Sequence, residues 1–210
     1  MMKKIFIVIS ILYSVAAMAQ GDDYIDTRRK NESFAKLPKD QIRTDLASFA
    51  LNGISESIGK EPFKKIPFTA FGSDFMTLEG EGIKATIRSA PFDPAKHKLQ
   101  YDEKYLIKID KKAYYGGYGS MPFRYISNIT LTVDGDSVDI PATAYADLYN
   151  VNFTYNDKGV QRSTNGIYRS KDGHRIYLYL FSKDNTGSYE VTWIIQDKHY
   201  LRRVLDYGFM

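Results

Sequence analysis

A serine and a lysine have the spacing of a catalytic pair. Ser57 and Lys60 form a Ser-x-x-Lys pattern, in which a lysine amine can activate a serine hydroxyl. The Ser-Asp-Asn and Lys-Thr-Gly segments that complete such a site are absent from the chain, and the pattern falls where a helix is expected to end. Gly-x-Ser-x-Gly and the glycine patterns that bind phosphates or dinucleotides are absent too. We therefore assign no catalytic residue.

Three histidines are far apart in the sequence: His97, His174 and His199. Zinc motifs usually place two ligands in one short segment, and these histidines show no such spacing. Folding could still gather them, but we expect them on the surface or at strand ends. The sequence therefore predicts neither a metal site nor a cofactor.

Acidic residues could supply a different chemistry, because hydrolysis of a glycosidic bond needs only two carboxylates across a cleft. Sequence spacing does not show which acids meet, so several are candidates and none is favoured: Glu79, Glu81, Glu103, Glu190 and Asp206. Another acidic group lies at an expected hairpin turn and lacks the ligand series of a calcium loop: Asp134, Asp136 and Asp139. A hydrolase with paired carboxylates remains an alternative.

Tyrosine is abundant, with 17 in the chain against one tryptophan. The segment 114–119 reads Tyr-Tyr-Gly-Gly-Tyr-Gly, a glycine-rich loop that could present aromatic rings to a sugar or a peptide. Tyr114, Tyr115 and Tyr118 are therefore the candidate ligand-binding residues. The same rings could instead pack over the end of a sheet while the glycines make a turn. Trp193 shares its strand parity with Val191 and Ile195, so we expect it in the core.

The first 19 residues have the plan of a cleavable secretory signal. Lys3 and Lys4 precede an apolar run, which ends in Ala-Met-Ala before Gln20. This leader resembles a bacterial export signal, which implies a periplasmic or extracellular protein. The apolar run is shorter than the roughly 20 residues of a membrane-spanning helix, and we expect no transmembrane segment after cleavage. The chain has no cysteine, so it forms no disulfide.

The composition is that of an ordinary globular protein, with 43% hydrophobic and 26% charged residues. The formal net charge is +4, and Lys and Arg are scattered among acids rather than clustered. This distribution argues against a nucleic-acid partner. Residues 20–37 have low apolar content and are expected to form a flexible lead-in, followed by a single domain over 38–210.

One amphipathic helix is expected near the start of this domain. Apolar residues recur there at steps of three and four, with Asp40 as a start cap and Gly59 as a stop. The apolar face consists of Ile42, Leu46, Phe49, Ala50, Gly53 and Ile54.

Strand patterns fill the rest of the domain. The expected strands include 83–87, 105–109, 125–133 and 137–140, the last two joined by a turn at Asp134-Gly135. In the strand at 105–109, Tyr105, Ile107 and Ile109 form the expected apolar face. The last third adds 151–155, 165–169, 175–181, 189–196 and 200–207, with the final three in an antiparallel meander. Residues 175–181 are apolar on both parities, which indicates a strand covered on both faces.

The sequence thus predicts a mainly β fold, an antiparallel β-sandwich or partly open barrel with one N-terminal amphipathic helix. Its function is not assignable from the residues alone. We favour an exported bacterial module without catalytic activity that binds a glycan or an envelope protein. The alternatives are an extracytoplasmic hydrolase and a structural component of the envelope.

Overall fold

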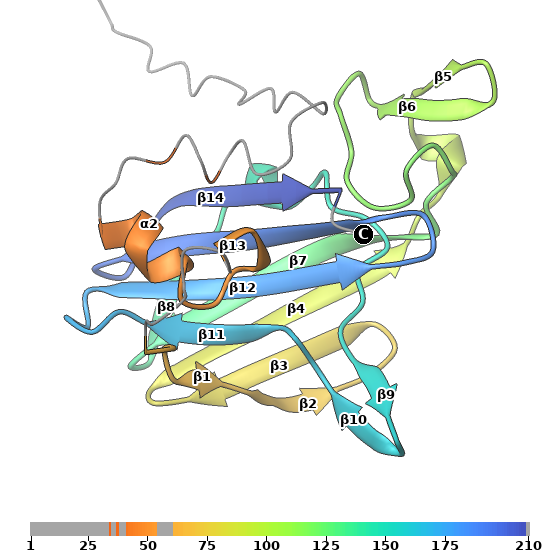
Figure 1. The fold of residues 1–210 in the computed structure, drawn as a ribbon. Helices are drawn as coiled ribbons and strands as arrows, with labels where there is room; N and C mark the ends of the chain where they lie inside the picture. The colour runs from red at the N-terminus through yellow and green to blue at the C-terminus, as the bar shows by residue number, and fades with distance from the viewer. Residues whose placement is uncertain (1–33, 35–36, 38–40, 54–60, 209–210) are drawn as a thin grey trace, which may run out of the picture.

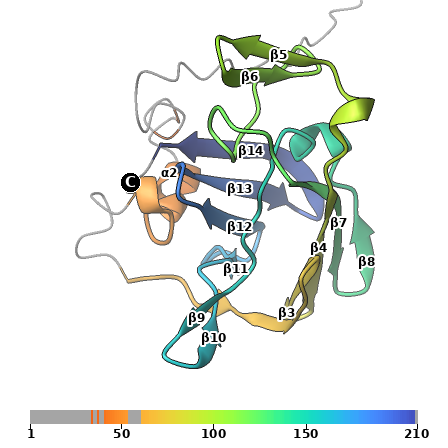
Figure 2. The ribbon, with the colours of Figure 1, turned by 90° about the vertical axis from the view of Figure 1, so that its right-hand side faces the viewer.

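Two antiparallel five-stranded sheets face each other in the computed structural model, which describes residues 34, 37, 41–53 and 61–208. Figures 1 and 2 show the two layers and the short helix on the outer side of one of them. The predicted mainly β sandwich is therefore confirmed, and the sheets are not closed into a barrel. The leader, most of the lead-in and the Ser57–Lys60 pattern lie outside the described residues.

The first sheet has the strand order β1-β11-β12-β13-β14. Its strands are β1 (Lys65–Ile66), β11 (Gly166–Arg169), β12 (Arg175–Lys183), β13 (Ser188–Gln196) and β14 (His199–Tyr207). The last three pair with their neighbours in sequence, which confirms the predicted C-terminal meander.

The second sheet has the order β2-β3-β4-β7-β8. Its strands are β2 (Phe68–Phe71), β3 (Phe75–Gly80), β4 (Ile83–Pro91), β7 (Arg124–Val133) and β8 (Asp136–Val138). Two hairpins stand outside both sheets: β5 (Leu99–Asp102) with β6 (Tyr105–Ile109), and β9 (Tyr155–Asp157) with β10 (Val160–Arg162). Three short 3-10 helices complete the described elements: η1 (Leu51–Gly53), η2 (Pro94–Lys96) and η3 (Ala142–Ala144).

The main core lies between the sheets. Trp193 is 0% exposed there and donates its indole N–H to the carbonyl of Ala144 at 2.8 Å, which confirms its predicted core position. Strand β12 is covered on both faces, as predicted. Leu178 faces the main core, whereas Tyr177 and Tyr179 face a second cluster on the outer side of the sheet.

That second cluster lies beneath the N-terminal helix. The α-helix α2 (Gln41–Leu46) is shorter than the predicted helix, and the chain continues through a turn into η1. The cause is a tertiary contact: the N–H groups of Leu51 and Asn52 donate to the carboxylate of Glu190 instead of to helix carbonyls. Phe34 and Leu37, in the expected lead-in, are buried in this cluster.

The prediction of a strand over 151–155 is wrong for most of its length, because the strand β9 begins at Tyr155. The expected alternation is present, with Val151 and Phe153 buried in the main core. The backbone N–H of Asn152, however, donates to the hydroxyl of Ser182 at 3.1 Å. An apolar alternation thus fixes which side chains are buried, whereas a strand also needs a neighbouring backbone.

Candidate functional site

The hairpin of β5 and β6, together with the loop 119–123 beside it, forms a projection that we call the arm. Figures 1 and 2 show β5 and β6 standing away from both sheets. The N–H of Leu106 in β6 donates to the carbonyl of Gly119 at 2.9 Å and ties the loop to the hairpin. The N–H of Phe92, directly after β4, donates to the carbonyl of Phe123 at 2.9 Å and ties the loop to the sandwich. The arm therefore has a defined position.

A small core of its own supports the arm. Leu106 and Ile109 of β6 are buried with Phe92 and Tyr149, separately from the main core. The rings of Phe92 and Tyr149 meet edge to face, with centroids 5.5 Å apart. This packing holds the arm against the sandwich at its base.

The base of the hairpin is also closed by polar contacts. The imidazole Nδ1 of His97 lies 2.7 Å from the carboxylate of Asp110, and the N–H of Lys98 donates to the same carboxylate at 2.8 Å. The hydrogen bond from His97 is the main cause of a pKa of Asp110 below its usual range, so this acid is ionised at neutral pH. His97 therefore has a structural partner in the described chain.

Exposed apolar side chains concentrate on the arm. Nine large apolar residues are exposed in the described parts of the chain, and five of them belong to the arm: Tyr101, Tyr105, Ile107, Met121 and Phe123. We call these five residues the arm surface. Tyr105 is 52% exposed and Phe123 is 63% exposed. A concentration of this kind marks a binding surface more often than scattered apolar residues do.

The structure differs from the predicted apolar face of β6 at Tyr105 and Ile107, whereas Ile109 is buried as predicted. The strand itself is confirmed, but Leu106 and Ile109 are buried whereas Tyr105 and Ile107 are exposed. Strand parity alone did not identify the arm surface, because which face is covered depends on distant parts of the chain.

Tyr114 of the predicted tyrosine loop is half-buried and braces the arm. Its hydroxyl lies 3.0 Å from the carbonyl oxygen of Leu106 and 3.1 Å from that of Ser120, and it accepts the N–H of Gly119 at 3.2 Å. Gly119 has a φ of +78°, and a Cβ there would lie 2.9 Å from the ring of Tyr105. The loop glycine therefore allows the ring of Tyr105 to approach the backbone closely.

The other two candidate tyrosines lie in the sandwich. Tyr115 is buried in the main core, and Tyr118 donates its hydroxyl to the carbonyl of Ser188 at 2.5 Å. Burial is the main cause of a raised pKa for the Tyr118 hydroxyl. The described contacts of all three tyrosines are structural. Ligand binding by Tyr114, Tyr115 and Tyr118 stays a prediction.

Two of the candidate acids meet in the fold. Glu190 on β13 and Asp206 on β14 are register partners on the outer face of the first sheet and are 3% and 2% exposed. Glu190 accepts hydrogen bonds from Tyr179 at 2.6 Å, Leu51 at 2.8 Å and Asn52 at 2.9 Å. Burial raises the pKa of Glu190, and the neighbouring Asp206 adds to this effect. These contacts fasten η1 to the sheet.

The other candidate acids lie apart from that pair. Glu79 forms an ion pair with Lys84 at 3.0 Å, and Glu81 pairs with Lys64 at 2.6 Å. Glu103 lies exposed at the tip of the arm, in the turn between β5 and β6. All three are exposed, unlike the buried pair.

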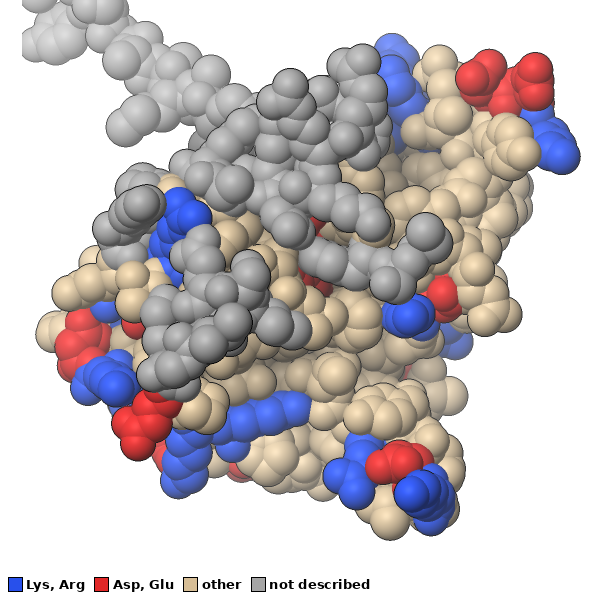
Figure 3. Space-filling model, viewed as in Figure 1, with Lys and Arg blue, Asp and Glu red and all other residues tan. Residues whose placement is uncertain are grey.

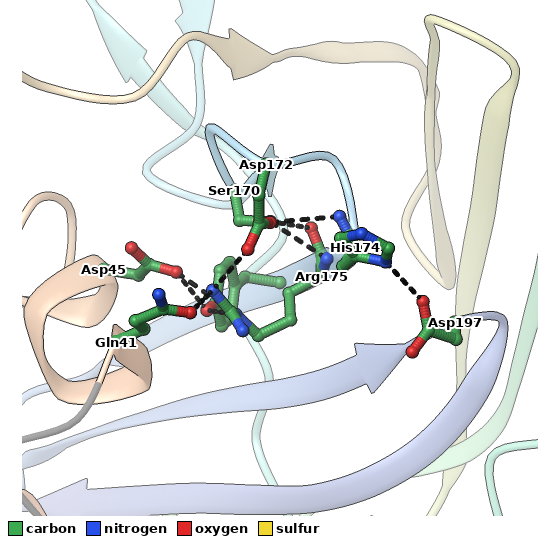
Figure 4. Close-up of polar contacts among 8 residues, drawn as sticks. Gln41, Asp45, Ser170, Asp172, His174, Arg175 and Asp197 are labelled. Carbon is green, nitrogen blue, oxygen red and sulfur yellow. Dashed lines mark hydrogen bonds and ion pairs between the residues drawn. The ribbon is translucent and has the colours of Figure 1, made fainter.

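A hollow of about 280 Å³ opens at one end of the sandwich, where Val133 and Ile176 of the main core line it. Its rim carries both cations and anions: Asp134, Arg169, Asp172, His174, Asp197 and Lys198. Figure 4 shows His174 pointing toward Asp197, and Asp172 lying between Ser170 and Arg175. The distance from His174 Nδ1 to Asp197 Oδ1 is 2.7 Å.

This rim resembles part of a hydrolytic site but lacks an activated nucleophile. The Ser170 hydroxyl donates to Asp172 at 2.5 Å and has no hydrogen bond to His174. The hydrogen bond from Ser170 is the main cause of a lowered pKa of Asp172, so this acid stays ionised. The hydrogen bond to Asp197 is the main cause of a raised pKa of His174. Lys198 pairs with Asp136 at 2.6 Å. The charges at this end therefore mainly neutralise one another.

The described residues contain no group of three or more side chains placed to hold a metal ion. His199 Nδ1 lies 2.8 Å from the backbone carbonyl of Asp197, while His97 lies at the base of the arm. Over the same residues, no helix is both long and apolar enough to span a membrane. Comparison of the chain with protein-family models, curated proteins and solved structures finds no match.

Proposed function

We propose that this chain is an exported module without catalytic activity and that the arm surface binds its ligand. The observation that carries the proposal is the concentration of exposed apolar side chains on the arm, which contains one of the two hairpins that stand outside both sheets. Leaving such side chains in water costs free energy, and a ligand that covers them recovers it. The export leader of residues 1–19 supports a site of action outside the cytoplasm.

A glycan is the ligand class that the arm surface fits best. Tyr101, Tyr105 and Phe123 offer aromatic rings, whose flat apolar faces match the C–H faces of sugar rings. Among the described residues, the hydroxyls of Tyr101 and Tyr105 have no hydrogen-bond partner in the chain, so they are available to a ligand. Tyrosine also loses little conformational entropy on binding, because it has only two side-chain torsions.

The arm surface is tested by comparing two hairpins of the same protein. The full chain without its leader is first screened against a panel of neutral and acidic polysaccharides. The double variant Tyr105→Ser, Phe123→Ser should not bind the polysaccharides that the wild type binds. The matched control is Tyr155→Ser with Val160→Ser on the β9–β10 hairpin, where the two side chains are 50% and 56% exposed. This control should bind like the wild type.

Several outcomes would overturn the proposal. One is equal binding by the arm variant and the wild type. Another is absence of binding to every polymer of the panel. A third is saturable binding to a single envelope protein through the same residues, which would make that protein the ligand. Unfolding curves for both variants should match the wild type within about 0.5 kcal/mol, because the changed side chains are exposed.

A further inference from the structure

Four lysines surround the base of the arm: Lys98, Lys108, Lys111 and Lys112, which we call the lysine patch. The hairpin brings them together, because the N–H of Asp110 donates to the carbonyl of Lys98 at 2.8 Å. Lys112 and Ile109 exchange two backbone hydrogen bonds of 2.9 and 3.0 Å. Lys108 follows Ile107 of the arm surface directly. The patch and the arm surface therefore belong to the same projection of the fold.

The patch lysines are only partly neutralised within the protein, by the single carboxylate of Asp110. In the described residues none of the four forms an ion pair with a carboxylate, whereas Lys64, Lys84, Lys96, Lys171 and Lys198 each do. The carboxylate that lies within the patch, Asp110, is held by His97 and by the N–H of Lys98. The patch therefore keeps unbalanced positive charge beside exposed rings.

We propose that the ligand of the arm is an acidic polysaccharide, whose sugar rings lie on the arm surface and whose carboxylates lie against the lysine patch. This inference rests on the proposed function and adds the charge of the ligand to it. Exposed ammonium groups attract carboxylates without fixing one geometry, which suits a polymer with a charge on successive sugars. The aromatic rings supply contact area and the lysines supply selectivity.

Two other anionic partners fit less well. Protein interfaces are depleted in lysine and enriched in arginine, and all four cations of the patch are lysines. An anionic membrane would repel the tip of the arm, where the exposed acids Asp102 and Glu103 outnumber the exposed Lys104. Figure 3 shows acidic side chains, with a basic side chain beside them, at the upper right extremity of the molecule, where the arm ends. A polymer lying along the flank of the arm avoids those acids.

The charge of the ligand is tested with polymers that differ only in charge. The full chain without its leader is mixed with polygalacturonate and with its fully methyl-esterified form, which has the same sugar ring and no carboxylate. Alginate and hyaluronate extend the acidic set. At low ionic strength we expect binding to at least one acidic polymer, at least tenfold weaker binding to the ester, and loss of binding as salt screens the charges.

A pair of lysine variants locates the contact. Lys111→Gln with Lys112→Gln should weaken binding of the acidic polymer by about threefold or more, since each exposed ion contact contributes a small amount. The matched control is Lys158→Gln with Lys183→Gln, which changes two exposed lysines outside the arm that lack ion pairs in the described chain. This control should leave the affinity unchanged.

The inference and the proposed function fail in different ways. Equal binding of the ester and the acid, or equal effects of the two lysine variants, would overturn the acidic ligand and leave a neutral glycan on the arm surface. Binding to poly-glutamate or to vesicles with anionic lipid, but to no polysaccharide, would also overturn it. If the Tyr105→Ser, Phe123→Ser variant binds every polymer like the wild type, the arm surface is not the binding site and the proposed function fails.

Discussion

The arm and the outer face of the first sheet use tyrosine in opposite ways. On the sheet, Tyr177 donates its hydroxyl to Asp45 at 2.5 Å and Tyr179 donates to Glu190 at 2.6 Å, beneath the N-terminal helical segment. On the arm, Tyr101 and Tyr105 are exposed. A buried tyrosine needs a partner for its hydroxyl. The chain itself therefore covers one set of rings and leaves the other set exposed to solvent.

The two regions also differ in how they are held. The sheet face belongs to a layered structure in which β12 and β13 pair over their whole length, whereas the arm has its own small core. Small clusters of this kind open more readily than the main core of a domain. We expect the arm to be a separate unit of stability.

The largest expected effects come from removing one leucine in each region. Leu178→Ala in the main core should lower the free energy of unfolding of the whole domain by about 2–5 kcal/mol, because it leaves a cavity. Leu106→Ala should lower the free energy of local unfolding of the arm by a similar amount, without destabilising the rest of the domain. Hydrogen exchange would then show faster exchange in residues 99–109 and unchanged exchange in β12 and β13. Equal loss of protection in both regions would show that the arm is part of the main cooperative unit.

A smaller effect is expected at the buried acid of the sheet face. Glu190→Ala removes the acceptor for Leu51, Asn52 and Tyr179, so it should lower the free energy of unfolding by about 2–4 kcal/mol. Urea denaturation measures this change. Glu79→Ala, which removes an exposed acid on β3, is the control and should be nearly neutral. Equal stability of the two variants would contradict the fastening role of Glu190.

The pH dependence of stability reports on the same acid. Because the pKa of Glu190 is raised in the folded protein, the folded state binds its proton more tightly than the unfolded state does. The wild type should therefore gain stability relative to Glu190→Gln as the pH falls from 7 to 5, by at most about 1.4 kcal/mol per pH unit. Denaturation curves at three pH values test this sign. A constant difference between the two proteins would contradict it.

The smallest expected effect separates bracing tyrosines from exposed ones. Tyr118→Phe loses the hydrogen bond to Ser188 and should lower the free energy of unfolding by about 1 kcal/mol. Tyr105→Phe loses no hydrogen bond within the described chain and should leave stability unchanged. Thermal denaturation measures both. If the Tyr118 variant keeps full stability and binds the ligand more weakly, the tyrosine loop is part of the binding site.

Much of the fold follows from local patterns. The strands near Ile83, Ile129 and Leu178 were predicted because alternation and β-branched residues are properties of short segments. The cover on both faces of β12 was also predictable, because its residues are apolar on both parities. The length of the helix was not, because Leu51 and Asn52 donate to an acid roughly 140 residues later in the chain.

The candidate site was predictable only in part. The sequence marked residues 114–119 as a concentration of tyrosine, and the structure places them next to the arm. The alternation in the sequence predicted that Tyr105 and Ile107 lie on a buried face, and this prediction is wrong. The hairpin packs onto Phe92 and Tyr149 with Leu106 instead. Which face of a two-stranded hairpin is covered depends on where the hairpin docks.

Neighbouring residues along the chain sufficed to predict an antiparallel, mainly β fold, most of its long strands, the core position of Trp193 and the expectation of export, because each depends on the order and type of nearby residues. Only the tertiary structure decided that Glu190 and Asp206 meet, that the arm surface faces solvent and that the lysine patch stands without carboxylate partners. The physical reason is that strand pairing and docking join residues far apart in the chain, and their free energies depend on the whole fold rather than on any one segment.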